Sequence, residues 1–108
     1  MISSVYRNRL RDGMRLEADP TVQYPIGRPG DWWPQITQAN YRDVISPYNL
    51  YLNFGLPPGP IANPGISAIE AAVNPEVSPY YYFRARCDGS GYHEFAITFD
   101  QHLANACP

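Results

Sequence analysis

The sequence predicts an α+β fold in which short helices pack against a small antiparallel β-sheet. Apolar residues recur at helical spacing, but only over short stretches that Gly or Pro interrupts. One aromatic-rich stretch, residues 80–95, contains an Asp-Gly-Ser-Gly turn and is typical of a β-hairpin. The chain has 108 residues, of which 12 are Pro, so we expect one small core and no long elements.

The first helix is predicted near the N-terminus. Ile2, Val5, Tyr6 and Leu10 fall on one face at helical spacing, and Gly13 follows as a typical helix stop. This pattern predicts an amphipathic helix with an apolar face toward the core.

A second, shorter helix is predicted to begin at Asp19-Pro20 and to run through Tyr24, with Asp19 as its N-cap. Residues 25–36 are rich in Pro and Gly and are expected to form a loop, hairpin-like, around Trp32-Trp33. The two Trp could form a lip of a binding groove or pack under the loop.

Two further short helices and one rigid segment are expected in the middle of the chain. Thr37 is predicted to cap a helix through Tyr41, and Ser46-Pro47 to start another through about Asn53. Residues 56–65, LPPGPIANPG, contain four Pro and two Gly, so we expect an extended segment that is held by proline rather than by backbone pairing.

The last third of the chain alternates between helix and strand signals. Residues 66–73 predict an amphipathic helix that ends before a Pro, residues 80–86 and 92–95 predict the two strands of the hairpin, and Thr98 with Gln101 matches a capping box for a final helix. We expect that helix to end near residue 106.

Composition excludes several classes of function. The formal charge is -2, so the chain lacks the basic excess that nucleic-acid binding needs, and no nucleic-acid partner is predicted. It contains no Lys, which excludes Schiff-base chemistry on a side-chain amine. The apolar runs are too short for a membrane span, and no signal peptide is expected within these residues.

The two cysteines leave two alternatives open. Cys87 and Cys107 could form a disulfide in an oxidising compartment or remain as free thiols. Together with His93 and His102 they supply zinc-type ligands, but the spacings do not match a common structural zinc pattern, and no metal site is predicted.

Five segments together resemble one protein family. They are NRLRDGM at 8–14, DPTVQY at 19–24, SPYNLYLNFGLPPGPIANPG at 46–65, AIEAAVNP at 68–75 and YYYFRARCDGSGYHEF at 80–95. In order and spacing they resemble the YceG-like domain of the endolytic murein transglycosylases (MltG type). The resemblance covers nearly the whole chain and identifies residues 1–108 as the C-terminal part of that catalytic domain.

The resemblance implies a membrane-anchored bacterial lyase that acts on the extracytoplasmic face of the cytoplasmic membrane. Such an enzyme cleaves the bond between N-acetylmuramic acid and N-acetylglucosamine in nascent peptidoglycan and leaves a 1,6-anhydromuramoyl end. The implied partners are peptidoglycan glycan strands and peptidoglycan synthases of the elongation or division machinery. No cofactor is implied.

The expected chemistry needs one carboxylic acid, which protonates the glycosidic oxygen and then takes the proton of the muramoyl 6-hydroxyl. In the family this Glu lies in an ASIIEKE-like segment upstream of the NRL motif, and the chain starts after that point. We therefore predict no catalytic residue in this chain and no activity for it alone. Neither Glu17 nor Glu94 is assigned to the role.

The remaining candidates would contact the glycan. Carboxylate, hydroxyl and amide groups can bond to sugar hydroxyls and N-acetyl groups, and aromatic rings can stack on the apolar face of a pyranose. Each type has a structural alternative, namely a helix cap, core packing or a turn. The predicted substrate-binding residues are Asp19, Thr21, Tyr24, Tyr48, Asn49, Tyr51, Asn63 and His93.

Two other functions compete with the transglycosylase interpretation. One is a non-catalytic module for glycan binding or divisome interaction. The other is the older family label aminodeoxychorismate lyase, which the composition disfavours because pyridoxal phosphate needs a Lys for its internal aldimine.

Overall fold

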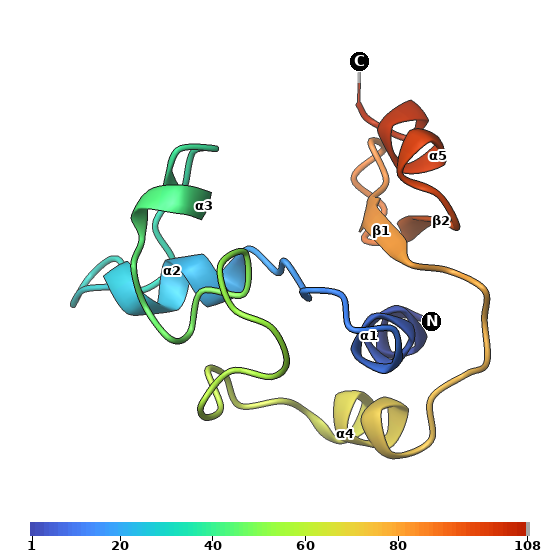
Figure 1. Cartoon of the computed structure of the whole chain (residues 1–108), viewed down its shortest axis with the longest axis horizontal. Coiled ribbons are helices and arrows are strands. Elements are labelled where there is room, and N and C mark those ends of the chain that lie inside the picture. The colour runs from blue at the N-terminus through green and yellow to red at the C-terminus, as the bar shows by residue number, and fades with distance from the viewer. Residues whose placement is uncertain (108) are drawn as a thin grey trace. The chain divides into compact units, whose positions relative to one another are not determined.

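The computed structural model describes residues 1–107, which divide into two compact units (Figure 1). Unit 1 comprises residues 1–11 and the chain from Gly65 onward, and unit 2 comprises residues 12–64. Within the described residues there are five short helices and one two-stranded antiparallel sheet, so the predicted α+β class is confirmed.

Unit 1 begins with α1 (Ile2–Arg11), as predicted, and Gly13 after it has the left-handed φ of +73°. Val5 lies in the core, but Leu10 is exposed, whereas the polar residues Asn8 and Arg9 are buried. The buried face of α1 therefore coincides only partly with the apolar face that the sequence predicts.

The polar side chains of α1 are buried because they bind the backbone that leads into the sheet. The Asn8 amide donates to the carbonyls of Ser78 and Tyr80, at 2.9 and 2.8 Å, and Arg9 Nε donates to the Tyr81 carbonyl at 2.6 Å. These bonds pair the buried polar side chains with carbonyls of the half-buried chain before β1.

The hairpin consists of β1 (Tyr82–Ala85) and β2 (His93–Ala96), which pair with Phe83 opposite Phe95. The first strand is shorter than the predicted 80–86 at both ends, and the second is shifted by one residue from the predicted 92–95. The pairing nevertheless continues beyond β1, because Tyr81 N–H donates to the Ala96 carbonyl at 3.0 Å. The predicted hairpin is confirmed with small shifts of its ends.

The two faces of the hairpin carry different clusters. On one face, the Phe83 ring contacts Tyr6 of α1 edge-on at 5.6 Å between ring centroids. On the other face, Tyr82 stacks with His102 of α5 (Phe99–Ala104) at 5.2 Å. The capping box of α5 is present as predicted, with the Thr98 hydroxyl accepting from the Gln101 backbone N–H.

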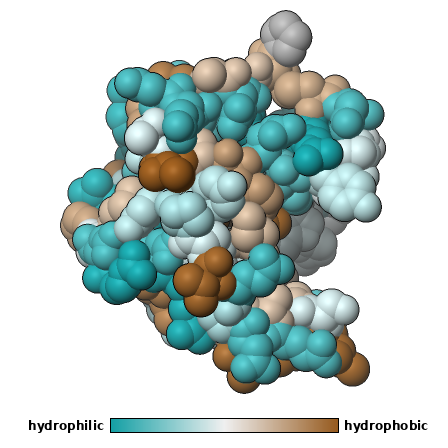
Figure 2. All heavy atoms as spheres, turned by 90° about the vertical axis from the view of Figure 1, so that its right-hand side faces the viewer, coloured by the Kyte–Doolittle hydropathy of each residue, from teal (hydrophilic) through white to brown (hydrophobic). Residues whose placement is uncertain are grey.

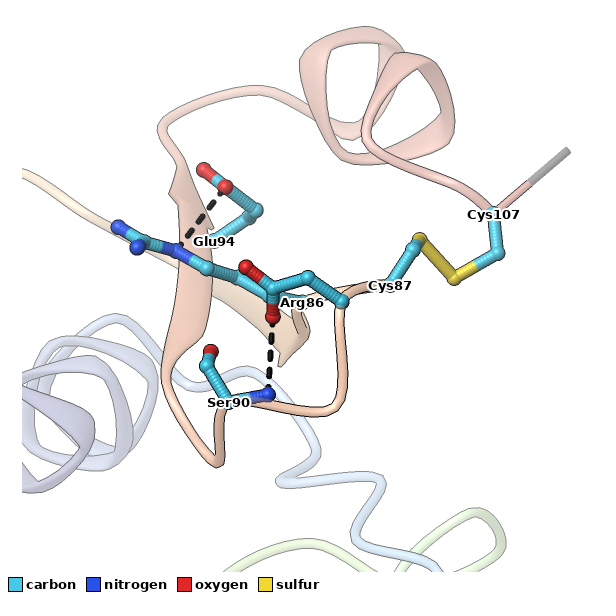
Figure 3. Close-up of a disulfide and its surroundings, with 6 residues drawn as sticks. Arg86, Cys87, Ser90, Glu94 and Cys107 are labelled. Carbon is cyan, nitrogen blue, oxygen red and sulfur yellow. Dashed lines mark hydrogen bonds and ion pairs between the residues drawn. A yellow bond between two sulfur atoms is a disulfide. The ribbon is translucent and has the colours of Figure 1, made fainter.

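Cys87 and Cys107 form a disulfide, with their Cα atoms 5.6 Å apart (Figure 3). The bridge joins the chain after β1 to the chain after α5. An ion pair between Arg86 and Glu94, 3.1 Å, and a bond from the Ser90 N–H to a turn carboxylate hold the same end of the hairpin. Of the two alternatives for the cysteines, the structure has the disulfide.

The predicted helix α4 (Ile66–Val73) is confirmed and is exposed along its whole length. Ile66, Ile69 and Val73 are among its exposed apolar residues, and the Arg7 guanidinium donates to the Ala72 carbonyl near its end. Figure 2 shows brown apolar side chains along the lower edge of the face that it views, at the height of α4 in Figure 1. In the part of the chain that the structure describes, none of the helices has the length and apolarity to cross a membrane.

Unit 2 begins its regular structure with α2 (Pro20–Ile26), which starts where predicted and continues two residues past Tyr24. The next helix, α3 (Asn40–Asp43), starts later than predicted, and Thr37 does not cap it. Instead the Asn40 side chain accepts from the Thr37 N–H at 2.8 Å, which places Thr37 in a turn before the helix.

The predicted helix at 46–53 is wrong, because these residues form consecutive turns. Its Ser46 hydroxyl accepts from the Tyr48 N–H, only two residues on, and the Asn49 side chain accepts from the Tyr51 N–H at 2.9 Å. Such local side-chain bonds compete with the helical pattern. Gly55 ends the segment with a φ of +81°. The proline-rich segment after it has no helix or strand, as predicted, but it bends repeatedly and is not the extended segment that we expected.

Candidate functional site

Seven of the eight predicted substrate-binding residues belong to unit 2, and His93 belongs to unit 1. The seven divide into residues that remain accessible and residues that are buried. Each group is best described through the contacts that position it.

Asp19 occupies the N-cap position of α2, as predicted, but its side chain does not cap the helix. Its backbone already has helical angles, φ −52° and ψ −42°, and its side chain makes no capping bond. The first amides of α2 bond instead to backbone carbonyls, including the bond from Thr21 N–H to the carbonyl of Ala18. The Asp19 carboxylate is thereby free to accept a hydrogen bond of 2.6 Å from the Tyr51 hydroxyl.

Tyr51 is held on both sides. Its ring stacks on Tyr41 with 4.0 Å between centroids and 7° between planes. Burial, together with the hydrogen bond to Asp19, raises the pKa of Tyr51 far above its ordinary value. The phenol therefore remains protonated and serves as a donor that orients Asp19.

Tyr41 is a member of this cluster that sequence reasoning missed. Burial and the nearby negative charge of Asp19 raise the pKa of Tyr41 as well. No local pattern marks this residue, since its importance depends on the approach of Tyr51, ten positions along the chain.

Tyr24 and Tyr48 form a second contact between α2 and the 46–53 turn. Their rings lie 5.0 Å apart and are tilted by 46°. Tyr24 is exposed, and the Tyr48 hydroxyl reaches Gly59 in the proline-rich segment, where an added Cβ would lie 3.3 Å from it. Asn63, in the same segment, is exposed.

Thr21 and Asn49 are buried and bond to the chain itself. The Thr21 hydroxyl donates to the Ala18 carbonyl at 2.6 Å and accepts from the Leu50 N–H at 3.2 Å. Asn49 is 0% exposed, and its amide donates to the carbonyls of Tyr41 and Val44, at 3.1 and 2.8 Å. In this structure both residues support the turn from within, in contrast to the surface contacts that the sequence suggested.

His93 lies on β2 and packs edge-on against Phe83, with 5.6 Å between ring centroids. It is half-buried within the aromatic face of the hairpin. The structure thus places His93 in unit 1, whereas the other seven candidates belong to unit 2.

The four residues weighed as zinc ligands do not assemble in this structure. Cys87 and Cys107 bond to each other. Within residues 1–107, no three His, Cys, Asp or Glu side chains lie close enough together to hold a metal ion.

A wide, open cleft of about 520 Å³ lies in unit 1 and contains none of the candidate residues. Polar and acidic side chains of α1, α4 and the chain after α4 line it. The lining residues are Met1, Ser3, Ser67, Glu70, Ala71, Asn74 and Glu76. Its composition offers no aromatic surface for a sugar, so the candidate site is the cluster in unit 2.

The accessible part of that cluster combines an oriented carboxylate with tyrosine rings and hydroxyls. Asp19 and Tyr24 are five residues apart on one helical stretch, which rises by about 7 Å over that distance. Their partners Tyr51 and Tyr48 are three residues apart in the facing turn. Together these groups can accept and donate hydrogen bonds to a neutral polar ligand and can contact its apolar faces.

Comparisons with known proteins identify the class. A family model described as the YceG-like family matches residues 1–107, so this chain belongs to the YceG-like family, as its motifs predicted. It is 47% identical over 90 residues to a protein of Bacillus subtilis (strain 168) named endolytic murein transglycosylase, which covers 82% of this chain and 23% of that protein.

Two further relatives agree. A Streptococcus pneumoniae serotype 2 protein of the same name is 36% identical over 89 residues, covering 79% of this chain and 16% of that protein. The crystal structure of a yceG-like protein of Listeria monocytogenes matches 96% of this chain and 32% of its own, with 46% identity and a TM-score of 0.85. The chain therefore spans about a third or less of each of these relatives.

Proposed function

We propose that this chain is part of an endolytic peptidoglycan lytic transglycosylase that cleaves the bond between N-acetylmuramic acid and N-acetylglucosamine in nascent glycan strands. Membership of the YceG-like family and the names of the relatives support the class of enzyme. The parent protein would act at the extracytoplasmic face of the membrane, beside peptidoglycan synthases. The disulfide Cys87–Cys107 agrees with an oxidising compartment.

The observation on which the glycan-binding part of the proposal chiefly rests is the Asp19–Tyr51 hydrogen bond of 2.6 Å at an exposed carboxylate. The carboxylate interacts with the hydroxyls of Tyr51 and Tyr41, and its remaining lone pairs can accept from a sugar hydroxyl or an N-acetyl N–H. Because Tyr41 stacks under Tyr51, the pair is preorganised and little conformational freedom is lost on binding.

Tyr24, Tyr48 and Asn63 would extend the contact along the strand. The Tyr24 ring is exposed and supplies an apolar face, while the Asn63 amide can donate and accept at once. Thr21 and Asn49 would act indirectly, by holding α2 and the 46–53 turn in place.

The chemical step needs an acid that this chain does not supply in our proposal. The acid protonates the glycosidic oxygen as the bond from the muramoyl C1 breaks, and its carboxylate then takes the proton of the 6-hydroxyl, whose oxygen bonds to C1 and closes the 1,6-anhydro ring. We assign neither Glu17 nor Glu94 to this role, and Glu94 already pairs with Arg86 in unit 1.

The test is a comparison of binding and cleavage by the 108-residue chain. We expect calorimetry to detect weak binding of purified glycan strands, and mass spectrometry to detect no anhydromuropeptides after incubation. An Asp19→Asn variant should bind more weakly by about tenfold, because the amide cannot accept as strongly as a carboxylate. Asp100→Asn, an exposed carboxylate of α5 in unit 1, is the matched control and should leave binding unchanged.

Two results would contradict the proposal. Anhydromuropeptides produced by the chain alone would place the catalytic acid within it. No glycan binding by the unmodified chain would remove the proposed role of the unit 2 cluster. Binding without cleavage, by a parent protein whose other residues supply no acid, would favour the non-catalytic glycan-binding module instead.

A further inference from the structure

Two tryptophans stand exposed on a loop of unit 2 outside the site described above. The side chains of Trp32 and Trp33 belong to residues that are 60% and 48% exposed, and the chain contains no other Trp. Of the two alternatives that the sequence left open for this pair, packing under the loop is therefore wrong. Two exposed indoles that are neighbours in the sequence supply exposed apolar area of the kind that marks an interaction site.

The loop that presents them is built as a tight hairpin. Arg28 and Asp31 exchange two backbone hydrogen bonds, of 3.1 and 2.8 Å, around Pro29 and Gly30. Gly30 has a φ of +86°, which a type II turn with Pro before it requires. The tryptophans follow directly after this turn, so the backbone beneath them is fixed at one end.

Two contacts with α2 and its end fix the loop further. A Cβ on Gly27 would lie 2.5 Å from the Trp32 carbonyl, so only glycine allows this close packing. The Gln23 amide, on α2, donates to the Pro34 carbonyl at 3.0 Å. The two indoles are thus carried on a braced loop that is attached to the helix of the candidate site.

The charge of the loop favours an uncharged sugar over an anionic membrane surface as its ligand. Residues 25–36 contain one Arg and one Asp, and the whole chain has no Lys. A surface that inserts into an anionic bilayer usually surrounds its aromatic residues with several cations. A neutral aromatic surface instead matches an uncharged ring with an apolar face, such as the pyranose of an N-acetylated sugar.

We propose that Trp32 and Trp33 form a stacking platform for N-acetylated sugar rings of a glycan strand. This inference rests on the proposed function and deepens it, because it adds an aromatic subsite to the hydrogen-bonding cluster around Asp19. Stacking on the tryptophans would add affinity for any N-acetylated sugar ring of the glycan strand. The hydrogen bonds of the cluster around Asp19 would fix the orientation of the strand.

The platform can be tested directly because its two residues are the chain's entire tryptophan content. Titration of the 108-residue chain with chitotetraose, a soluble oligomer of N-acetylglucosamine, should change the intrinsic tryptophan fluorescence with saturation. The same titration is followed in parallel by calorimetry. Vesicles of phosphatidylglycerol or of phosphatidylcholine test for membrane binding. We expect neither to change the tryptophan fluorescence spectrum.

Variants separate the platform from the rest of the chain. We expect Trp32→Ala and Trp33→Ala each to weaken chitotetraose binding by about tenfold, and Trp33→Phe to retain part of the affinity. Tyr92→Ala is the matched control, since it removes an aromatic residue that is 68% exposed in unit 1. Circular dichroism establishes that each variant is folded.

Three outcomes would overturn the platform, and they distinguish it from the proposed function. Calorimetric binding with no fluorescence change and no loss in the Ala variants would remove the platform and leave the proposed function standing. A blue shift with vesicles but none with the sugar would assign the tryptophans to a membrane surface. Absence of chitotetraose binding by the unmodified chain would refute the platform, and the proposed function would still stand if purified glycan strands bound.

Discussion

The two units of this chain are stabilised in different ways. Unit 1 is stabilised by a β-hairpin with paired strands, a helix capping box and the disulfide Cys87–Cys107. In unit 2 single polar side chains, above all Asn49, replace the hydrogen bonds that a helix or a sheet would provide. We therefore expect single substitutions to have larger effects in unit 2, which is also the unit that contains most of the candidate site.

Asn49→Ala should produce the largest loss of stability. It removes three hydrogen bonds at a fully buried amide and leaves the carbonyls of Tyr41 and Val44 and the N–H of Tyr51 without their partners. An unsatisfied buried group costs about 1–3 kcal/mol, so we expect a loss on the order of 4 kcal/mol or failure of unit 2 to fold. Urea denaturation measures the loss, and hydrogen exchange by mass spectrometry shows where it falls.

The matched control for that substitution is Asn63→Ala, since Asn63 is exposed in the same unit. We expect it to change the free energy of unfolding by less than about 0.5 kcal/mol. Equal losses in the two variants would mean that the Asn49 bonds do not stabilise the turn.

Removal of the disulfide should have the next largest effect and should be confined to unit 1. The bridge joins residues 20 positions apart, and closing a loop of that size restricts the unfolded chain by about 3 kcal/mol. In a Cys87→Ser/Cys107→Ser variant we expect faster hydrogen exchange in β1, β2 and α5. Equal loss of protection in residues 12–64 would show that the two units unfold together and would break the comparison between them.

Tyr51→Phe should have a smaller effect with a pH signature. The variant keeps the ring that stacks on Tyr41 but loses the bond to the exposed Asp19 carboxylate, which we expect to cost about 1 kcal/mol near neutral pH. Because the pKa of Tyr51 is raised in the folded chain, the unfolded chain releases this proton first as the pH rises through about 10. Stability should thus fall above pH 10, and less steeply in the variant.

Urea titrations at pH 8 to 11 measure that difference. Tyr48→Phe is the control, because it also removes one phenol from the facing turn but leaves the Asp19–Tyr51 bond intact. If Tyr48→Phe and Tyr51→Phe flattened the alkaline slope equally, the slope could not be assigned to the bond with Asp19.

The elements that could be predicted from sequence are those whose signals are local. Gly13 after α1, the Thr98–Gln101 capping box and the Gly-rich turn between β1 and β2 each act within a few residues. Their geometry depends little on the rest of the chain. These predictions were confirmed apart from small shifts at the ends of the elements.

The features that could not be predicted depend on partners outside the segment that carries the signal. Asp19-Pro20 is a typical start of a helix, but Tyr51, 32 positions away, binds the carboxylate. The 46–53 segment has the composition of a capped helix, yet the Asn49 amide bonds to carbonyls five and eight positions earlier and keeps the backbone in turns. Tertiary contacts here override local preference, and the same contacts determine which candidate residues remain accessible.

The smallest predicted effect concerns His102. It tests whether the stability of unit 1 depends on pH through this side chain. Burial under the stack with Tyr82 lowers the pKa of His102, and the positive charges of Arg84 and Arg9 lower it further. The His102 Nδ1 atom is buried and has no hydrogen-bond partner among the described residues. The folded state thus resists protonation at this ring.

It follows that the unfolded chain binds this proton more readily as the pH falls through about 6.5, so unit 1 should lose stability on acidification in that window. In His102→Phe the ring still stacks on Tyr82 but cannot titrate, and in His102→Gln the stack is lost as well. We expect both variants to flatten the dependence of the urea midpoint on pH between 7 and 5, while only His102→Phe keeps the stability measured at pH 8. If both variants retained the slope of the unmodified chain, the acid sensitivity would belong to carboxylates elsewhere, and the cationic surroundings of His102 would have no measurable effect on folding.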